Sequence, residues 1–145
     1  MNKIALLLCV CVCSGPACAK PIRAKNYIDT ISVAKEKSAV DYLALVRKAE
    51  SGGVGAIKWM LLLGMYGGFD GASKIGHDDV MYKIFSSQNI AFFQAYTELP
   101  DIVKKSVKGD LKHQYKLNVE NGVSWEVKFK KLQNRFSNMN SRANQ

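Results

Sequence analysis

The chain has no cysteine after residue 18, few prolines and two histidines, and beyond its N-terminal segment no apolar run is long enough to span a bilayer. All four cysteines lie close together near the N-terminus, at Cys9, Cys11, Cys13 and Cys18. The rest of the chain therefore has no cysteine for a disulfide framework or for a cysteine-based zinc site. A domain of this composition has to be stabilised by its hydrophobic core.

The N-terminal segment has the pattern of a secretory signal peptide. Lys3 supplies a short basic region, an apolar run follows from Ile4 to Val12, and Ala17-Cys18-Ala19 is a small-residue cleavage motif. We therefore expect residues 1–19 to be a signal peptide that is cleaved off. The mature chain is then exported, and we expect it in the periplasm.

The mature chain is expected to begin at Lys20 and to form one domain, because it is long enough for one hydrophobic core and too short for two. We expect a single helical domain over residues 20–137 and a flexible polar tail over 138–145. A lipoprotein signal with a lipidated Cys18 is the less favoured alternative, because Gly15 stands where such signals usually carry a branched apolar residue.

The charge of the chain is strongly basic. Its formal net charge of +9 falls to +8 when Lys3 is removed with the signal peptide. Basic proteins attract nucleic acid, anionic membrane surfaces or acidic proteins. Export disfavours nucleic acid among these three partners.

Hydrophobic periodicity predicts an all-α fold, a compact small bundle of about five helices. Apolar residues recur at helical spacing in five segments, at residues 38–50, 54–71, 80–85, 89–99 and 100–117. Ser38 is expected to cap the first of these helices. The preceding segment, residues 20–37, is either a lead-in arm or a short helix. Gly64 and Gly68 are four residues apart, which would place them on one helix face and let a neighbouring helix approach closely.

The segment from Tyr115 to Phe136 fits two structures. Apolar residues alternate on both sides of Glu120-Asn121-Gly122, which is typical of a β-hairpin with Gly122 in the turn. The same segment and the residues after it carry an apolar stripe at helical spacing, formed by Trp125, Phe129, Leu132, Phe136 and Met139. A helix is favoured, because the stripe continues past the point where a strand would end.

The sequence contains no recognisable catalytic constellation. His77, Asp78 and Asp79 are the densest cluster of potential metal ligands, but three consecutive side chains cannot converge on one ion without help from elsewhere. We interpret this segment as a helix cap, and we expect His113 to face solvent. No serine lies in a Gly-x-Ser-x-Gly turn, and no glycine-rich loop has the context of a phosphate site. We therefore predict no enzymatic activity, no cofactor and no bound metal.

Two segments resemble a known family. Leu63–Gly71 (LGMYGGFDG) has two glycines four apart followed by an acid, and Phe93–Asp101 (FQAYTELPD) has a helix that ends in a tyrosine, followed by proline with an acid. In these features the chain is similar to small periplasmic helical immunity proteins that neutralise type VI secretion amidases, which cut peptidoglycan peptides.

The resemblance implies that the exported protein binds an incoming cell-wall-degrading toxin and blocks its substrate cleft, without a catalytic residue of its own. A basic surface suits an acidic partner. The candidate contact residues lie in an expected loop and on a lysine-rich helix face: Phe69, Asp70, His77, Asp78, Lys104, Lys105 and Lys108. The alternative is a peripheral envelope protein that binds anionic membrane or cell wall through a basic amphipathic C-terminal face, with Trp125 and Phe129 on its buried side.

Overall fold

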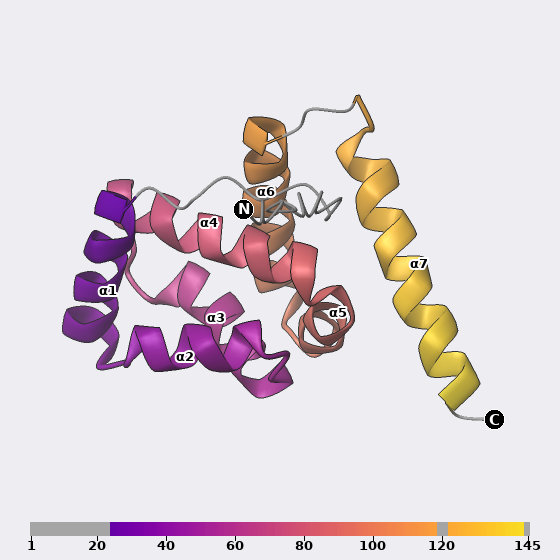
Figure 1. The fold of residues 1–145 in the computed structure, drawn as a ribbon, viewed down its shortest axis with the longest axis horizontal. Coiled ribbons are helices and arrows are strands. Elements are labelled where there is room, and N and C mark those ends of the chain that lie inside the picture. Colours follow the sequence, from indigo (N-terminus) through magenta and orange to yellow (C-terminus); the bar gives the residue numbers. More distant parts are fainter. Residues whose placement is uncertain (1–23, 119–121, 144–145) are drawn as a thin grey trace, which may run out of the picture.

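The computed structural model describes residues 24–118 and 122–143, and within these ranges the chain forms seven helices and no strand (Figure 1). The helices are α1 (Ala24–Ser38), α2 (Tyr42–Glu50), α3 (Val54–Tyr66), α4 (Gly71–Ser87), α5 (Asn89–Thr97), α6 (Asp101–Asn118) and α7 (Trp125–Ala143). The all-α prediction is confirmed, whereas the expected number of about five helices is too low. The expected signal peptide, residues 1–19 with Cys18, lies outside the described residues.

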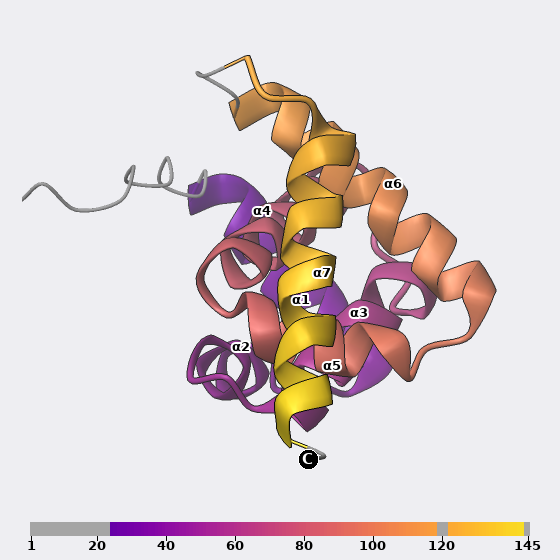
Figure 2. The ribbon, with the colours of Figure 1, turned by 90° about the vertical axis from the view of Figure 1, so that its right-hand side faces the viewer.

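Helices α1 to α5 form the body of the molecule, and α6 and α7 flank it (Figure 1). α1 packs on α4, while α2 and α5 both pack on α3. α6 packs against α3 and α4, and α7 contacts α5 and α6. Figure 2 is viewed from the side of α7 and shows this helix crossing in front of the others. α7 is therefore attached to the body along one of its faces.

The first two helices differ in their boundaries from the expected ones. Residues 20–37 were expected to be an arm or a short helix; from Ala24 onward they form α1, which continues to Ser38, the residue predicted to cap the next helix. The cap of α2 is instead Asp41, whose carboxylate accepts a hydrogen bond from the backbone N–H of Ala44 at 3.0 Å. Serine and aspartate are similarly good N-caps, so local preference alone does not choose between them.

The C-terminal region is helical on both sides of residues 119–121, which lie outside the described residues. Tyr115 belongs to α6, and Trp125 begins α7. The β-hairpin alternative is therefore not found. α7 also extends to Ala143, so the segment expected to be a flexible tail from residue 138 is helical as far as 143.

The glycine pair predicted to share a helix face is split by the end of α3. Tyr66 is the last residue of α3, and Gly68 follows in a left-handed conformation with φ of 71°. Gly64 is inside α3, and a Cβ atom placed on it would lie 3.0 Å from His77 Nε2. The close approach expected at Gly64 is present, and a side chain of α4 makes it.

Aromatic residues from α4, α5 and α7 meet in the core. Phe85 of α4 lies with its ring centroid 5.2 Å from that of Phe92, 5.6 Å from that of Trp125 and 6.1 Å from that of Phe129. Trp125 and Phe129 are 3% and 4% exposed. Burial of large aromatic side chains is the main stabilising contribution available to a domain of this size. These rings hold α7 against the body.

We expect Gly64→Ala to destabilise the fold by about 1–3 kcal/mol, because the new methyl group would displace His77. Gly109→Ala is the matched control in α6, where a Cβ atom would meet no atom within 4 Å. It should stabilise the protein by about 0.5–1 kcal/mol, because alanine is the better helix former. Urea denaturation measures both values. Equal stability of the two variants would contradict the close approach at Gly64.

We expect Phe129→Ala to lower the free energy of unfolding by about 3–5 kcal/mol, because it removes a buried ring from the contact between α4, α5 and α7. Val127→Ala, at a position that is 59% exposed, should change it by less than about 0.5 kcal/mol. Urea denaturation compares the two variants. A mild effect of Phe129→Ala would mean that α7 is not held by this contact.

Candidate functional site: a buried histidine cluster and a basic helical surface

The seven residues predicted to contact a partner form two separate groups. Phe69, Asp70, His77 and Asp78 lie where α3 is followed by α4, and the three lysines lie on α6. The segment from Gly76 to Asp79, which was expected to cap a helix, is inside α4. The cap is Asp70, whose backbone N–H donates to Ser73 Oγ at 2.9 Å in a capping box. Asp70 therefore has a structural role at the start of α4.

His77 lies in the interior of the protein and is 1% exposed. Its Nδ1 atom is 2.9 Å from the Tyr42 hydroxyl of α2. Its ring is stacked on that of Phe69, with a centroid distance of 4.7 Å, and Phe69 also meets Tyr42 edge-on at 6.1 Å. The structure thus brings Phe69 and His77 together, as part of the packing between α2, α4 and the loop after α3. His77 is too deeply buried to contact a partner directly.

Burial determines the charge of His77. Desolvation, together with the nearby Lys74 ammonium, lowers the pKa of His77 to about 3, although a hydrogen bond with the Met60 backbone acts to raise it. The ring is therefore neutral at neutral pH. Its Nε2 atom has no hydrogen-bond partner of ordinary geometry among the described residues. Burial also raises the pKa of the Tyr42 hydroxyl, which stays protonated.

Asp78 takes part in an ion-pair bridge between α4 and α6. Lys74 pairs with Asp78 one turn along α4 and with Asp110 of α6, at 2.8 Å from the latter. Burial raises the pKa of Asp78 to about 6, although the contact with Lys74 acts to lower it. The Asp78 side chain is 12% exposed. The structure therefore gives Asp78 a partner within the protein.

The positive charge of the protein is concentrated on α6 and α7. Together these two helices carry ten lysine and arginine residues against three acids, a local net charge of +7 out of the formal total of +9. Lys104 lies 3.5 Å from Asp101, and Lys108 lies over the ring of Phe129. Lys105 is exposed. The predicted lysine face thus lies on one of the two helices that carry most of the positive charge.

We use the name outer stripe for the face of α7 that points away from its buried aromatic residues. Each member has others three or four residues away along the helix: Val127, Lys130, Lys131, Asn134, Arg135, Asn138, Met139 and Arg142. All of them are exposed. The stripe contains four bases and no acid, and these bases form no ion pair within the part of the chain that the structure describes.

The sequence analysis predicted a basic amphipathic C-terminal face, but it did not include the outer stripe among the candidate contact residues. The signal for it is the same helical periodicity that predicted the apolar stripe, read on the other side of the helix. Because the segment also fitted a β-hairpin, the sequence alone did not determine which of its side chains face solvent.

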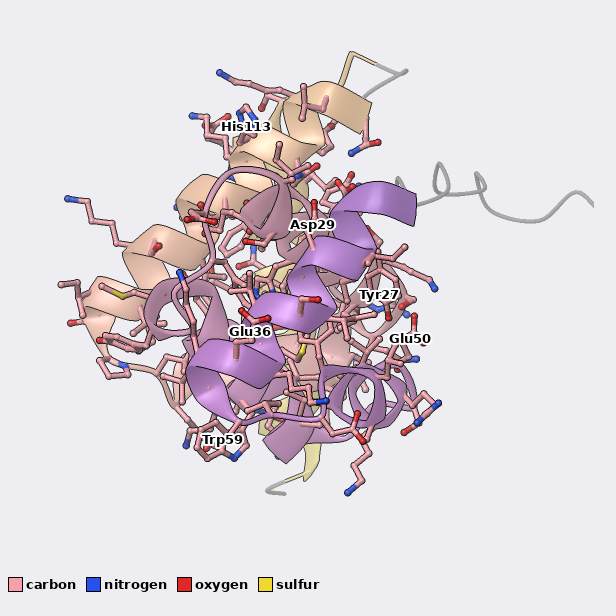
Figure 3. The ribbon with its side chains drawn as sticks, turned by 90° about the vertical axis from the view of Figure 1, so that its left-hand side faces the viewer. Tyr27, Asp29, Glu36, Glu50, Trp59 and His113 are labelled. Atoms are coloured by element: carbon pink, nitrogen blue, oxygen red, sulfur yellow. The ribbon has the colours of Figure 1, made fainter. Side chains whose placement is uncertain are left out.

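His113 was correctly predicted to be exposed. It lies in the C-terminal half of α6, at the opposite end of the view in Figure 3 from Trp59.

Comparisons with known proteins reveal no relative: no family model, no curated protein and no solved structure matches the chain significantly. Across the described residues, no helix has the length and apolar character needed to cross a membrane. Within the same ranges, no three or more His, Cys, Asp or Glu side chains converge as ligands for a metal ion.

We expect His77 to make the fold less stable as the pH falls. Its pKa is lower in the folded state, about 3, than its ordinary value of 6.5, so the unfolded chain takes up a proton that the folded protein does not. The contribution of neutral His77 to the free energy of unfolding is fully present above pH 6.5. It declines below that pH and has fallen by about 2 kcal/mol at pH 5. Asp78 acts in the opposite direction, because its pKa of about 6 in the folded state lies above its ordinary value and the folded protein takes up this proton first. As the pH falls to 5, Asp78 offsets about 1 kcal/mol of the loss.

Urea denaturation at pH 7 and pH 5 tests this expectation. His77→Gln should lose about 2 kcal/mol less stability between these two pH values than the wild type does. His113→Gln, which removes the exposed histidine of α6, is the control and should follow the wild type. The same pH dependence in the wild type and in His77→Gln would contradict a buried neutral His77.

Proposed function

We propose that this chain is an exported binding protein that inhibits a cell-wall-degrading toxin by covering the toxin's substrate cleft, and that it does so with the basic surface of α6 and α7. The observation that carries the proposal is the outer stripe of α7, which is exposed, carries four bases and contains no acid. Blocking a cleft requires only a surface that fits it, so the inhibitor needs no catalytic group of its own.

An acidic protein is the partner that this surface suits best. Complementary charge raises the rate of association and fixes the orientation of the two partners. The stripe also contains exposed Val127 and Met139, which add apolar contact area next to the bases. Methionine adapts well to the shape of a partner surface. The combination of bases with two apolar side chains favours a packed protein interface.

The alternative, a peripheral envelope protein, has one observation in its favour and one against it. The positive charge of α6 and α7 would attract anionic lipid or cell wall. However, the aromatic residues that would have anchored α7 in a membrane, Trp125 and Phe129, are packed in the core. An interfacial helix needs a sizeable apolar face turned toward the lipid, and the outer stripe offers only Val127 and Met139. We therefore favour the protein inhibitor.

Co-purification from the native host tests the proposal. The chain is expressed with its own N-terminal segment and a C-terminal tag, and proteins that co-purify from the periplasm at physiological salt are identified by mass spectrometry. We expect one stoichiometric peptidoglycan-degrading enzyme whose activity falls when the chain is added. Recovery with membrane or cell wall, lost as the ionic strength rises and without a protein partner, would contradict the proposal.

Charge reversal then tests the surface. We expect Lys130→Glu combined with Arg135→Glu to slow association with the captured enzyme by at least about tenfold, because the field that steers the encounter is lost. Lys35→Glu combined with Lys48→Glu makes the same change in net charge on α1 and α2, away from α7 (Figure 1), and should leave the rate nearly unchanged. Surface plasmon resonance at two salt concentrations measures both. Equal effects of the two pairs would rule out α7 as the contact.

A further inference from the structure

One face of α3 is apolar and exposed. The helix contains no acid and a single base, Lys58. A helix that is apolar almost all round is normally covered on every side, but in α3 Trp59 is 60% exposed and Tyr66 is 64% exposed. Figure 3, viewed from the side opposite α7, shows Trp59 at the lower edge of the molecule. Two large aromatic side chains of α3 are therefore available to a ligand.

These two side chains project from the same side of the helix. They are seven residues apart, which separates their backbone positions by about 10 Å along the helix axis and by about 20° around it. Gly55, one turn before Trp59, is exposed and adds no side chain, and Leu62 between the two aromatic residues is partly buried. We use the name aromatic face for Gly55, Trp59, Leu62 and Tyr66.

The aromatic face carries no charge. The one charged residue of α3, Lys58, is paired outside this face, with its Nζ atom 2.8 Å from Oε2 of Glu98. The outer stripe of α7, in contrast, carries four bases. An acidic partner is therefore attracted to α7, whereas the aromatic face is complementary to an uncharged ligand.

The area of the aromatic face is too small for a stable protein interface. A large aromatic side chain buries about 150–250 Å² in a full contact, so two of them at about 60% exposure offer about 200–300 Å². A stable protein interface, including a homodimer, needs about 800 Å² from each partner. Two ring faces are sufficient for a carbohydrate, because the C–H groups on one side of a pyranose ring pack against an aromatic ring.

The spacing of Trp59 and Tyr66 fits one kind of carbohydrate. Their separation along α3 is close to the length of one disaccharide repeat in an extended β-1,4-linked glycan, so alternate sugars of such a strand would meet the two rings. We propose that the aromatic face binds an uncharged β-1,4-linked glycan strand by stacking on Trp59 and Tyr66. This inference rests on the export part of the proposed function, which brings the chain to the glycan of the cell wall, and does not depend on a toxin or on α7.

Titration with a soluble glycan tests the proposal. The probe is the hexamer of β-1,4-linked N-acetylglucosamine, and isothermal titration calorimetry measures its affinity for the purified protein. We expect the wild type to bind the hexamer, and Trp59→Ala and Tyr66→Ala each to bind it at least about tenfold more weakly, because each loses one stacked ring. Both substitutions are at mostly exposed positions and should leave the fold intact.

Leu117→Ala is the matched control for this titration. It removes an apolar side chain of similar exposure, 59%, one turn beyond His113 on α6, and should bind the hexamer as the wild type does. Failure of the wild type to bind the hexamer would overturn the proposal. Equal affinities of the wild type and Trp59→Ala would overturn it as well.

Pelleting with insoluble peptidoglycan separates the aromatic face from the basic surface. We expect the wild type to pellet at low and at high salt, because salt does not screen the stacking of uncharged groups, and Trp59→Ala to stay in solution at high salt. Pelleting that high salt abolishes would assign the binding to the bases of α7 and overturn the proposal. A dimer in analytical ultracentrifugation that Trp59→Ala dissociates would overturn it in favour of a second copy of the chain. No toxin is present in these experiments, so their failure is distinct from failure of the proposed inhibition.

Discussion

The position of α7 depends on the contact of its aromatic side chains with Phe85. Phe85 belongs to α4 and lies against Phe92 of α5 as well as Trp125 and Phe129 of α7. A helix that is held by an apolar stripe on one face must present its opposite face to solvent. In α7 that opposite face is the outer stripe, so the packing of the core determines where the unpaired bases lie. The aromatic contact also stabilises α7 as a helix, because most of the stability of a helix in a protein comes from the packing of its apolar face.

Because the positive charge is concentrated on α6 and α7, it can orient an approaching partner, which net charge alone cannot do. The remainder of the described chain is close to neutral, so the molecule is polarised rather than uniformly basic. A polarised protein approaches an oppositely charged partner in a preferred orientation, whereas a uniformly basic one is attracted without a preference. The ion pairs within this surface, such as that of Lys112 with Glu126, are exposed and contribute little to stability. The surface is thus better suited to a partner than to holding the fold together.

The sequence predicts the helical class and the buried stripe of α7 because both follow from local periodicity. Trp125, Phe129 and Phe136 recur at helical spacing and are buried, whereas Met139, which was predicted on the same apolar stripe, is 45% exposed near the end of α7. The hydrogen bond between Tyr42 and His77 has no such local signal, because its partners are 35 residues apart and meet only after α2 and α4 have packed. From the sequence, His77 and the two acids that follow it are therefore interpreted as a helix cap. In the structure, tertiary packing buries His77 inside α4. Which of Ser38 and Asp41 caps α2 was also decided by the surrounding fold and not by residue type.

The two groups of candidate contact residues differ in how far the fold already engages them. The loop that carries Phe69 is fixed near the end of α1, where Lys37 donates to the carbonyl of Gly68 at 3.0 Å, whereas α7 flanks the opposite side of the body (Figure 1). Asp70 and His77 are also engaged in capping and packing, so a partner could use them only by opening the fold. The lysines of α6 are less constrained, since Lys105 is exposed, Lys104 pairs with the exposed Asp101 and Lys108 lies over the Phe129 ring. Structural constraints on the first group therefore favour the basic residues of α6 and α7 as the contact in the proposed function.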